Sequence, residues 1–373
     1  MKVKLGEMNI SKEIEQAVLA TLLKGGTTEG PETEYFEKNL SEYIGMKNCV
    51  ATSSGTSALW LIFDVLKDQA PHVNRKLITS PLTYAATINA PHLTRNYGIE
   101  LVDIEMDTFG MDMEQANLLL DDLKQDRFYY EHFEQYEPII YPVHLLGYPV
   151  NLSKLDHHGL LLIEDACEAV GSTYRGKMCG SLGYASAVSF YPSHTLPVGE
   201  MGAILTNDED FAFQCRLGKN NGRNQKDFKN SFVHKRIGLN MKSNDIMASI
   251  ANIRLKTARE MIQRRQEIAK IYYSELYPKM EVGPLSKDCS YLGFPIICAS
   301  RKEKFELLEC LERCEVEARS MFPLIPDQPS YHNGWGQAFP VAQRVSDCGL
   351  YVPCHQYLSD EQVKYVIQVI KNC

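Results

Sequence analysis

Short apolar segments alternate with helical segments from the start of the chain to about Gly202, and this alternation limits the possible folds most. The segments that we expect to be strands are Cys49–Thr52, Lys76–Ser80, Glu100–Asp103, Pro138–Val143, Leu160–Glu164, Ala187–Tyr191 and Ala203–Thr206. Helical periodicity is typical of the segments Ile10–Leu23, Thr33–Ile44, Ser57–Leu66 and Ala85–His92. This alternation predicts an α/β fold with a mostly parallel, buried sheet and helices on both faces.

The pattern changes after the last of these strands. A polar stretch follows, and Asn244–Glu275 then forms a long, strongly helical segment. The chain has 373 residues, which is enough for one large domain and a smaller one. We therefore expect a large cofactor-binding domain over residues 1–250 and a small C-terminal α+β domain over residues 251–373, ending in a helix over Ser359–Lys371.

Composition narrows the function classes. The net charge of -8 argues against a nucleic-acid partner, because binding to phosphates needs clustered Lys and Arg. We see no apolar run of the roughly 18 residues that a membrane span needs, so no membrane partner is expected. The N-terminal MKVKLGEMNI has no apolar core of signal-peptide length. We expect a soluble, cytoplasmic protein.

The 11 cysteines are scattered and odd in number, so a disulfide framework is not expected. Cys310 and Cys314 lie four residues apart, and Cys348 and Cys354 lie near the end. Neither pair has the short double-pair spacing of a zinc or iron–sulfur site. We expect reduced structural thiols and no metal site.

Two loops rich in small and hydroxyl residues follow predicted strands, at the strand ends where open α/β sheets bind ligands. The first, TSSGTSAL (Thr52–Leu59), offers backbone N–H groups and a helix N-terminus to an anion, although an ordinary helix cap has the same pattern. The second, SPLTYAAT (Ser80–Thr87), carries Tyr84, whose ring could stack on an aromatic cofactor or simply pack in the core.

Two further loops carry ionisable side chains. In LLLIEDACEAVGS a buried strand ends in Glu164 and Asp165, where a carboxylate is costly unless it is paired. An Asp facing a pyridinium nitrogen would be such a pair, and Glu168 follows one helical turn later. In SAVSFYPSHTLPVGEMGAILTND, Ser189 could meet a phosphate, and His194 lies in a turn between two strands. A lone His is more often structural, but this one lies alongside the other three loops.

In order and spacing these loops resemble the DegT/DnrJ/StrS-type family of sugar aminotransferases, which have the aspartate-aminotransferase fold (PLP fold type I). The resemblance covers nearly the whole chain. It includes GTTEGPETEYFEKNLSEYIGMKNCVATSSGTSAL, PVHLLGYPVNL, EDACEAVGSTYRGKMCGSLG, GLNMKSNDIMASI and FPVAQRVSDCGLYVPCHQYLSDEQVKYVI. It implies pyridoxal or pyridoxamine 5'-phosphate as cofactor, a nucleotide-sugar substrate and glutamate as amino donor.

The resemblance also implies roles for the matching residues in cofactor binding. Gly55, Thr56 and Ser189 would hold the cofactor phosphate. Tyr84 would stack on the ring, and Asp165 would pair with the pyridine nitrogen.

The resemblance bears on two further residues, Glu168 and Asn240. Glu168 falls where many relatives have a Gln near the ring hydroxyl. Asn240 matches an Asn that reaches the cofactor phosphate in the partner's active site, which implies a homodimer with shared sites.

The chain departs from the family pattern at His194, where aminotransferases carry the lysine that links covalently to the cofactor. Imidazole has no primary amine, so His194 cannot form that link. With a histidine at this position, the chain resembles a minority branch of the family, the sugar 3-dehydratases such as GDP-4-keto-6-deoxymannose 3-dehydratase. With an unperturbed pKa near 6.5, a His can accept one proton and donate one to a leaving hydroxyl, so His194 is the predicted catalytic residue.

Several functions stay open at this point. The chain could be a 3-dehydratase of a nucleotide-linked 4-keto-6-deoxy sugar, a divergent sugar aminotransferase, or an aminotransferase whose lysine was replaced at position 194. A fourth possibility is a catalytically inactive binding protein, but an intact Asp165, Tyr84 and Ser189 argue against it. An iron–sulfur branch of the family needs a cysteine cluster after the active-site loop, where this chain offers only Cys215.

Overall fold

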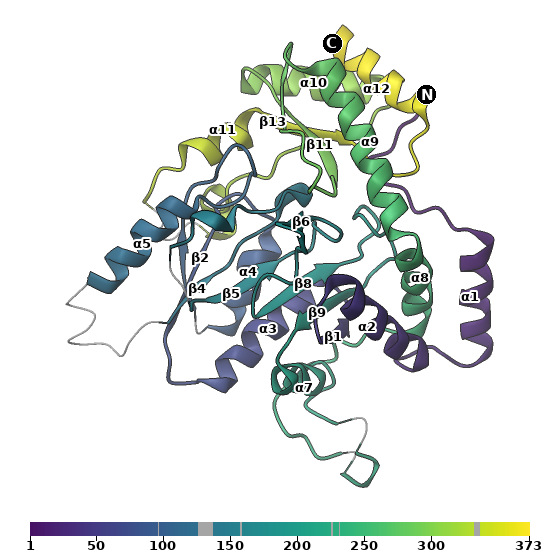
Figure 1. The fold of residues 1–373 in the computed structure, drawn as a ribbon, viewed down its shortest axis with the longest axis vertical. Helices are drawn as coiled ribbons and strands as arrows, with labels where there is room; N and C mark the ends of the chain where they lie inside the picture. Colours follow the sequence, from purple (N-terminus) through teal and green to yellow (C-terminus); the bar gives the residue numbers. More distant parts are fainter. Residues whose placement is uncertain (96, 126–136, 157–158, 225–226, 231, 332–335) are drawn as a thin grey trace.

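The computed structural model describes residues 1–95, 97–125, 137–156, 159–224, 227–230, 232–331 and 336–373. A seven-stranded sheet forms the centre of its larger part, and a four-stranded sheet lies in the C-terminal part (Figure 1). Both ends of the chain lie beside the helices of the C-terminal part. Among the described residues, no helix is long and apolar enough to cross a lipid bilayer.

The larger sheet has the strand order β1-β9-β8-β5-β4-β2-β3. Neighbouring strands from β8 to β3 are parallel, whereas β9 runs antiparallel to both β1 and β8. The prediction of a mostly parallel sheet is confirmed, with β9 as its reversed strand. The bounds are β1 Asn48–Thr52, β2 Arg75–Thr79, β3 Tyr97–Leu101, β4 Glu137–Ile140, β5 Leu161–Asp165, β8 Ala185–Ser189 and β9 Gly202–Thr206.

Helices cover both faces of this sheet, because successive side chains of a strand point to opposite faces. Ala187 and Ile204 belong to the core cluster that α3 also joins, whereas Val188 and Leu205 belong to the cluster formed with α2 and α8. The helices of the larger part are α1 Lys12–Leu23, α2 Pro31–Ile44, α3 Gly55–Gln69, α4 Ala85–Thr94, α5 Met113–Gln125, α7 Glu209–Gly218 and α8 Asp245–Lys256. A short hairpin of β6 (Thr173–Tyr174) and β7 (Lys177–Met178) lies apart from the sheet.

The long helical segment predicted after Asn244 is two helices rather than one, because the backbone leaves the helical conformation at Thr257 (φ -111°). We call residues 258–373 the C-terminal region; its antiparallel sheet has the order β10-β11-β13-β12. Its bounds are α9 Ala258–Leu276, β10 Glu281–Val282, β11 Gly293–Ile297, α10 Arg301–Arg313, β12 Arg319–Ser320, α11 Pro340–Cys348, β13 Gly349–Pro353 and α12 Asp360–Asn372. The chain's first residues join this region, since Val3 forms a bridge with Val316.

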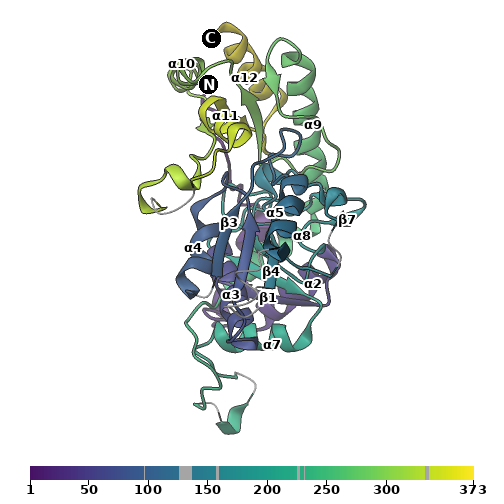
Figure 2. The same ribbon diagram turned by 90° about the vertical axis from the view of Figure 1, so that its left-hand side faces the viewer.

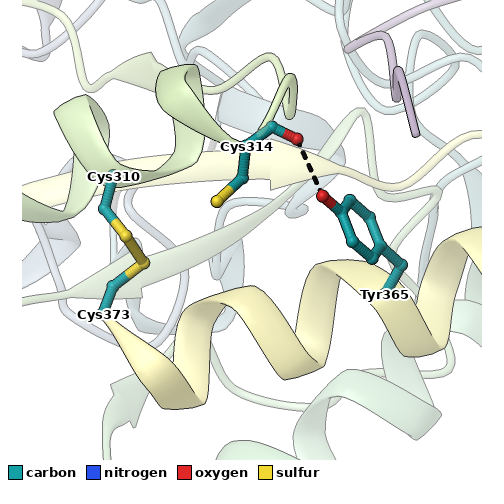
Figure 3. Close-up of a disulfide and its surroundings, with 4 residues drawn as sticks. All are labelled: Cys310, Cys314, Tyr365 and Cys373. Atoms are coloured by element: carbon teal, nitrogen blue, oxygen red, sulfur yellow. Dashed lines mark hydrogen bonds between the residues drawn. A yellow bond between two sulfur atoms is a disulfide. The ribbon is translucent and has the colours of Figure 1, made fainter.

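A disulfide joins Cys310 in α10 to Cys373 at the end of α12 (Figure 3). The expectation that all cysteines are reduced is therefore wrong for these two residues. No local pattern indicates this pairing, because the two cysteines lie 63 residues apart and meet only when the two helices pack together. The nearby Cys314 is a free thiol whose carbonyl accepts a hydrogen bond from the hydroxyl of Tyr365 at 3.1 Å (Figure 3).

Candidate active site

The carboxyl ends of β1, β2, β5 and β8 meet at one cavity of about 380 Å³. This is the place where parallel strands deliver loops to a ligand. Side chains of the C-terminal region close the opposite side. Of the residues predicted to form the site, the cavity is lined by Gly55, Thr56, Tyr84, Asp165, Glu168, Ser189 and His194.

One end of the cavity is formed by the first turn of α3. The Ser54 hydroxyl caps this helix by accepting a hydrogen bond from the Ser57 amide at 3.1 Å. A Cβ atom on Gly55 would lie 2.9 Å from the Cβ of Ser189, so glycine lets the helix start approach that hydroxyl residue closely. A Cβ on Gly202 would likewise lie 2.5 Å from the Gly55 nitrogen. The result is a helix N-terminus beside a serine, which suits an anionic group such as a phosphate.

A carboxylate lies deeper in the cavity. The Thr87 hydroxyl donates to Asp165 Oδ2 at 2.7 Å, and the Cys167 amide donates to Oδ1 at 3.2 Å. Burial raises the pKa of Asp165 above its ordinary value, although these hydrogen bonds act to lower it. A cationic ring nitrogen opposite this carboxylate would remove the cost of burying it unpaired.

The preceding carboxylate, Glu164, faces away from the cavity and is fully buried. It accepts hydrogen bonds from the backbone amides of Gly180, Leu182 and Gly183 at 2.7–2.9 Å. The ring of His144 also meets it at 3.0 Å through Nε2, while Nδ1 accepts from the Val150 amide. The sequence showed that a buried carboxylate needs partners, and Glu164 obtains them from a loop 16–19 residues further on.

Tyr84 and Glu168 both line the cavity. Tyr84 is 61% exposed, and its ring centre lies 6.1 Å from that of Phe322. Glu168 Oε2 accepts a hydrogen bond from the Leu146 amide at 2.7 Å. Burial raises the pKa of Glu168 to about 7, against the lowering effect of that hydrogen bond, so this carboxyl group is partly protonated near neutral pH.

His194 lies in the loop between β8 and β9. Its amide donates to the Tyr191 carbonyl at 2.8 Å, and its ring centre is 5.8 Å from that of Tyr191. Its Nδ1 atom is buried, and none of the described residues forms a hydrogen bond with it. Burial, assisted by the positive charge of Arg265, lowers the pKa of His194 to about 4, although the Ser189 backbone acts to raise it. The imidazole is therefore neutral near neutral pH and can accept a proton.

The charges around the cavity include one residue that the sequence did not reveal. Among the described residues that line it, none is a lysine, and Arg319 is the one fixed cation. Arg319 stands directly opposite Tyr351 in the pairing of β12 with β13, and its positive charge acts to lower the pKa of that phenol, which burial raises. A two-residue strand leaves no periodic pattern, so no sequence signal marked Arg319.

Asn240, the remaining predicted site residue, is not brought into this cavity. It lies exposed at the base of a projecting segment that we call the arm, formed by the described residues 219–224, 227–230 and 232–242 (Figure 2). Its side-chain oxygen accepts a hydrogen bond from Lys242 Nζ at 2.6 Å. Its predicted role therefore depends on a second copy of the chain.

Comparisons with known proteins agree with this architecture. The sequence model of the DegT/DnrJ/EryC1/StrS aminotransferase family matches residues 8–371. GDP-perosamine synthase of Escherichia coli O157:H7 is 29% identical over 352 residues, covering 93% of this chain and 91% of that protein. Helicobacter pylori PseC, an aminotransferase involved in the biosynthesis of pseudoaminic acid, has a TM-score of 0.88 at 25% identity, covering 100% of this chain and 99% of that one.

A third relative is similar in fold. The structure of E. coli GDP-4-keto-6-deoxy-D-mannose-3-dehydratase with bound hydrated PLP has a TM-score of 0.85 at 21% identity, covering 99% of both chains. The expected PLP fold type I is thereby confirmed. The residues present also fit a pyridoxal-type cofactor: the start of α3 and Ser189 suit a phosphate, and the buried carboxylate of Asp165 lines the same cavity.

Proposed function

The chain belongs to the DegT/DnrJ/EryC1/StrS aminotransferase family, whose members are PLP-dependent enzymes that act on sugars, and on that premise we propose a specific reaction. It is the 3-dehydration of a nucleotide-linked 4-keto-6-deoxy sugar, with His194 as the acid and base. The names of the relatives support the substrate class, since one is a GDP-perosamine synthase and another a dehydratase of a GDP-linked 4-keto-6-deoxy sugar.

One observation carries this proposal. His194 lines the cavity, and among the described residues that line it none is a lysine. The resemblance of its loop to the family's motif implies that this histidine stands where the aminotransferases have their lysine. A lysine there would bind the cofactor covalently and could complete an amino transfer. Without it, the cofactor is held by non-covalent contacts alone, and elimination is favoured over transfer.

The chain's own residues would hold the cofactor in its pyridoxamine form. Gly55, Thr56 and Ser189 would bind its phosphate, Tyr84 would lie against its ring, and Asp165 would pair with the ring nitrogen. When bound, this group supplies an amine that condenses with a keto sugar and a ring that accepts electrons.

His194 would move the protons. Its pKa of about 4 keeps the imidazole neutral at pH 7, as a base requires. Nδ1 is buried, so we assign the exchange of protons with bound reactants to Nε2. This nitrogen would accept a proton from the bound reactants and return one to the hydroxyl group that leaves carbon 3 of the sugar.

Glutamate would serve as the electron source. Replacing a hydroxyl group by hydrogen is a two-electron reduction of the sugar. Glutamate supplies these electrons as it becomes 2-oxoglutarate, and its nitrogen leaves as ammonia. Arg319 is a suitable partner for an anionic group of a substrate, since a guanidinium binds a carboxylate or phosphate through paired hydrogen bonds.

The active protein would be a homodimer with shared sites. Asn240 is exposed on the arm rather than placed in its own chain's cavity. The arm also carries exposed apolar side chains, with Phe232 80% exposed and Ile237 90% exposed. A contiguous set of such side chains is typical of an interface. In the dimer, Asn240 would reach the cofactor phosphate in the partner's cavity.

The decisive experiment supplies the purified protein with pyridoxamine phosphate, glutamate and a GDP- or dTDP-linked 4-keto-6-deoxy sugar. Dehydration predicts a 3-deoxy sugar together with equal amounts of ammonia and 2-oxoglutarate. An amino sugar formed without ammonia would show that the chain is an aminotransferase instead. No turnover of any such sugar, with the cofactor bound, would support an inactive binding protein. The His194→Gln variant is the matched control, since it keeps a polar side chain but cannot shuttle protons.

Borohydride reduction of the wild-type protein loaded with pyridoxal phosphate tests the covalent link separately. We expect no trapped cofactor in the wild type and trapping in His194→Lys, which would also turn yellow. Trapping in the wild type would show that some lysine takes over the linking role and would contradict the argument from the cavity.

A further inference from the structure

Arg265 in α9 is the largest side chain buried in the interior, with 1% of its surface exposed. Its five hydrogen-bond acceptors are neutral oxygen atoms, and among the described residues no carboxylate forms an ion pair with it. Burial lowers the pKa of Arg265 to about 10, so the guanidinium stays charged at neutral pH. An unpaired buried charge is costly, and a residue that bears this cost calls for a functional explanation.

The acceptors of Arg265 come from two parts of the chain. Four lie in the C-terminal region: Nε donates to the Gln356 side chain at 2.7 Å, and Nη1 donates to the carbonyls of Tyr291 at 2.8 Å, Cys354 at 3.2 Å and Leu292 at 3.4 Å. These bonds fix the guanidinium in one orientation, since its five N–H groups form a rigid fork.

The fifth acceptor lies in the candidate active site. Arg265 Nη2 donates to the backbone carbonyl of His194 at 3.2 Å. Within the part of the chain that the structure describes, this is the hydrogen bond that joins His194 to the C-terminal region. A comparable bond holds the same loop three residues further on, where Arg254 donates to the carbonyl of Pro197 at 3.2 Å. Arg254 belongs to α8 and not to the C-terminal region.

We infer that Arg265 is a positioning residue for His194: held by the C-terminal region, its guanidinium fixes the backbone of His194 and presents a constant positive charge to the imidazole. This inference rests on the proposed role of His194 as the proton carrier. It adds that the C-terminal region, which also supplies Arg319 and Tyr351 to the cavity, sets the geometry and the protonation of that base.

The charge favours the neutral imidazole and makes its protonated form a stronger acid toward a leaving hydroxyl group. A nearby cation disfavours the protonated imidazole, so Arg265 contributes to the lowered pKa of His194, after burial. Other charged and titratable groups line the same cavity, and the Arg265 variants leave them unchanged. They are Asp165, Cys167, Glu168, Glu200, Arg319, Tyr84, Tyr191 and Tyr351.

The test measures the titration of His194 itself, which needs no substrate. The histidine ring signals of the protein are recorded by NMR as a function of pH, and the His194 signal is assigned by its loss in His194→Gln. Arg265→Met keeps the length and apolar stem of the side chain but removes the charge, so we expect the His194 pKa to rise by about one unit. Arg254→Met is the matched control, because it also removes a buried arginine that donates to a carbonyl of the same loop, and we expect it to leave the His194 pKa unchanged.

Arg265→Lys separates position from charge and covers the case in which Arg265→Met does not fold. It keeps the charge but cannot reproduce the fork of hydrogen bonds. We expect His194 to titrate as in the wild type, while kcat falls by up to about 100-fold with little change in KM.

The inference is overturned if Arg265→Met lowers stability yet leaves His194 titrating as in the wild type. It is also overturned if Arg265→Lys has the wild-type kcat. If the protein does not dehydrate sugars, the NMR titration still shows whether Arg265 changes the pKa of His194. The two proposals can therefore be rejected independently.

Discussion

Two ionisable side chains of the cavity have pKa values that move in opposite directions. Burial raises the pKa of Glu168 from 4.5 to about 7, and burial lowers the pKa of His194 from 6.5 to about 4. Where a pKa is raised, the folded protein holds a proton that the unfolded chain releases, so stability falls as pH rises between the two values. Where a pKa is lowered, stability instead rises with pH over that window.

These opposite signs predict opposite effects for two variants. As pH rises from 4.5 to 7, the wild type loses the stability that the protonated Glu168 contributes, and Glu168→Gln does not. The free energy of unfolding of Glu168→Gln should therefore rise relative to the wild type by about 1–3 kcal/mol over this range. As pH rises from 4 to 6.5, the wild type gains stability from the neutral His194, and His194→Gln does not. The free energy of unfolding of His194→Gln should therefore fall relative to the wild type by a similar amount over this range. Urea unfolding at several pH values measures both differences. Parallel curves for either variant and the wild type would contradict the corresponding shift.

Arg319 gives a prediction about binding. It is the one fixed cation among the described residues lining the cavity, and both glutamate and a nucleotide sugar carry negative charge. Because a charge-assisted hydrogen bond is worth about 1.5–3 kcal/mol, Arg319→Gln should raise the KM of at least one of these substrates by about 10- to 100-fold. Steady-state kinetics with each substrate varied in turn identifies which one. Arg319→Lys keeps the charge and should lose less; unchanged KM values for both substrates in Arg319→Gln would rule out the contact.

At the scale of elements, the disulfide between α10 and α12 predicts a stability difference. It closes a segment in which the two cysteines lie 63 residues apart, and such a link is worth about 2–4 kcal/mol. Cys373→Ser should therefore lower Tm, and a reducing agent should lower the wild-type Tm to a similar value. Cys314→Ser is the matched control, since Cys314 is a free thiol close to the disulfide (Figure 3). A wild-type Tm that does not respond to reductant would contradict the prediction.

The elements of the larger sheet could be predicted from the sequence because each is a local pattern. The strand that ends in Asp165 and the loop that begins at Gly55 were found in this way, and both reach the cavity. Features that depend on distant contacts could not be found. The reversed direction of β9, the break at Thr257 and the placement of Arg319 are set by packing between segments, which no short stretch of sequence records. The same limit applies to Arg265, whose partners lie 26–91 residues away.

At the scale of the whole molecule, the arm is the feature that a single chain does not explain. It extends away from the body beyond α7 in both views, and it exposes Phe232 and Ile237 (Figures 1 and 2). If the arm packs against a second copy, then Ile237→Asp should shift the protein from dimer to monomer in sedimentation velocity. Leu23→Asp is the matched control, because Leu23 is 80% exposed at the end of α1. A wild-type protein that sediments as a monomer would contradict the proposed dimer.

A sharper test asks whether each site takes residues from both chains. His194→Gln should lack the base, and Asn240→Ala should bind the cofactor weakly, so each homodimer is expected to be inactive. In a mixed dimer one cavity combines both defects, but the other receives His194 from one chain and Asn240 from its partner, and is intact. Random exchange of subunits should therefore restore about a quarter of the wild-type activity. If Asn240 served its own chain's cavity, every site in the mixed dimer would carry one defect, and mixing would restore nothing.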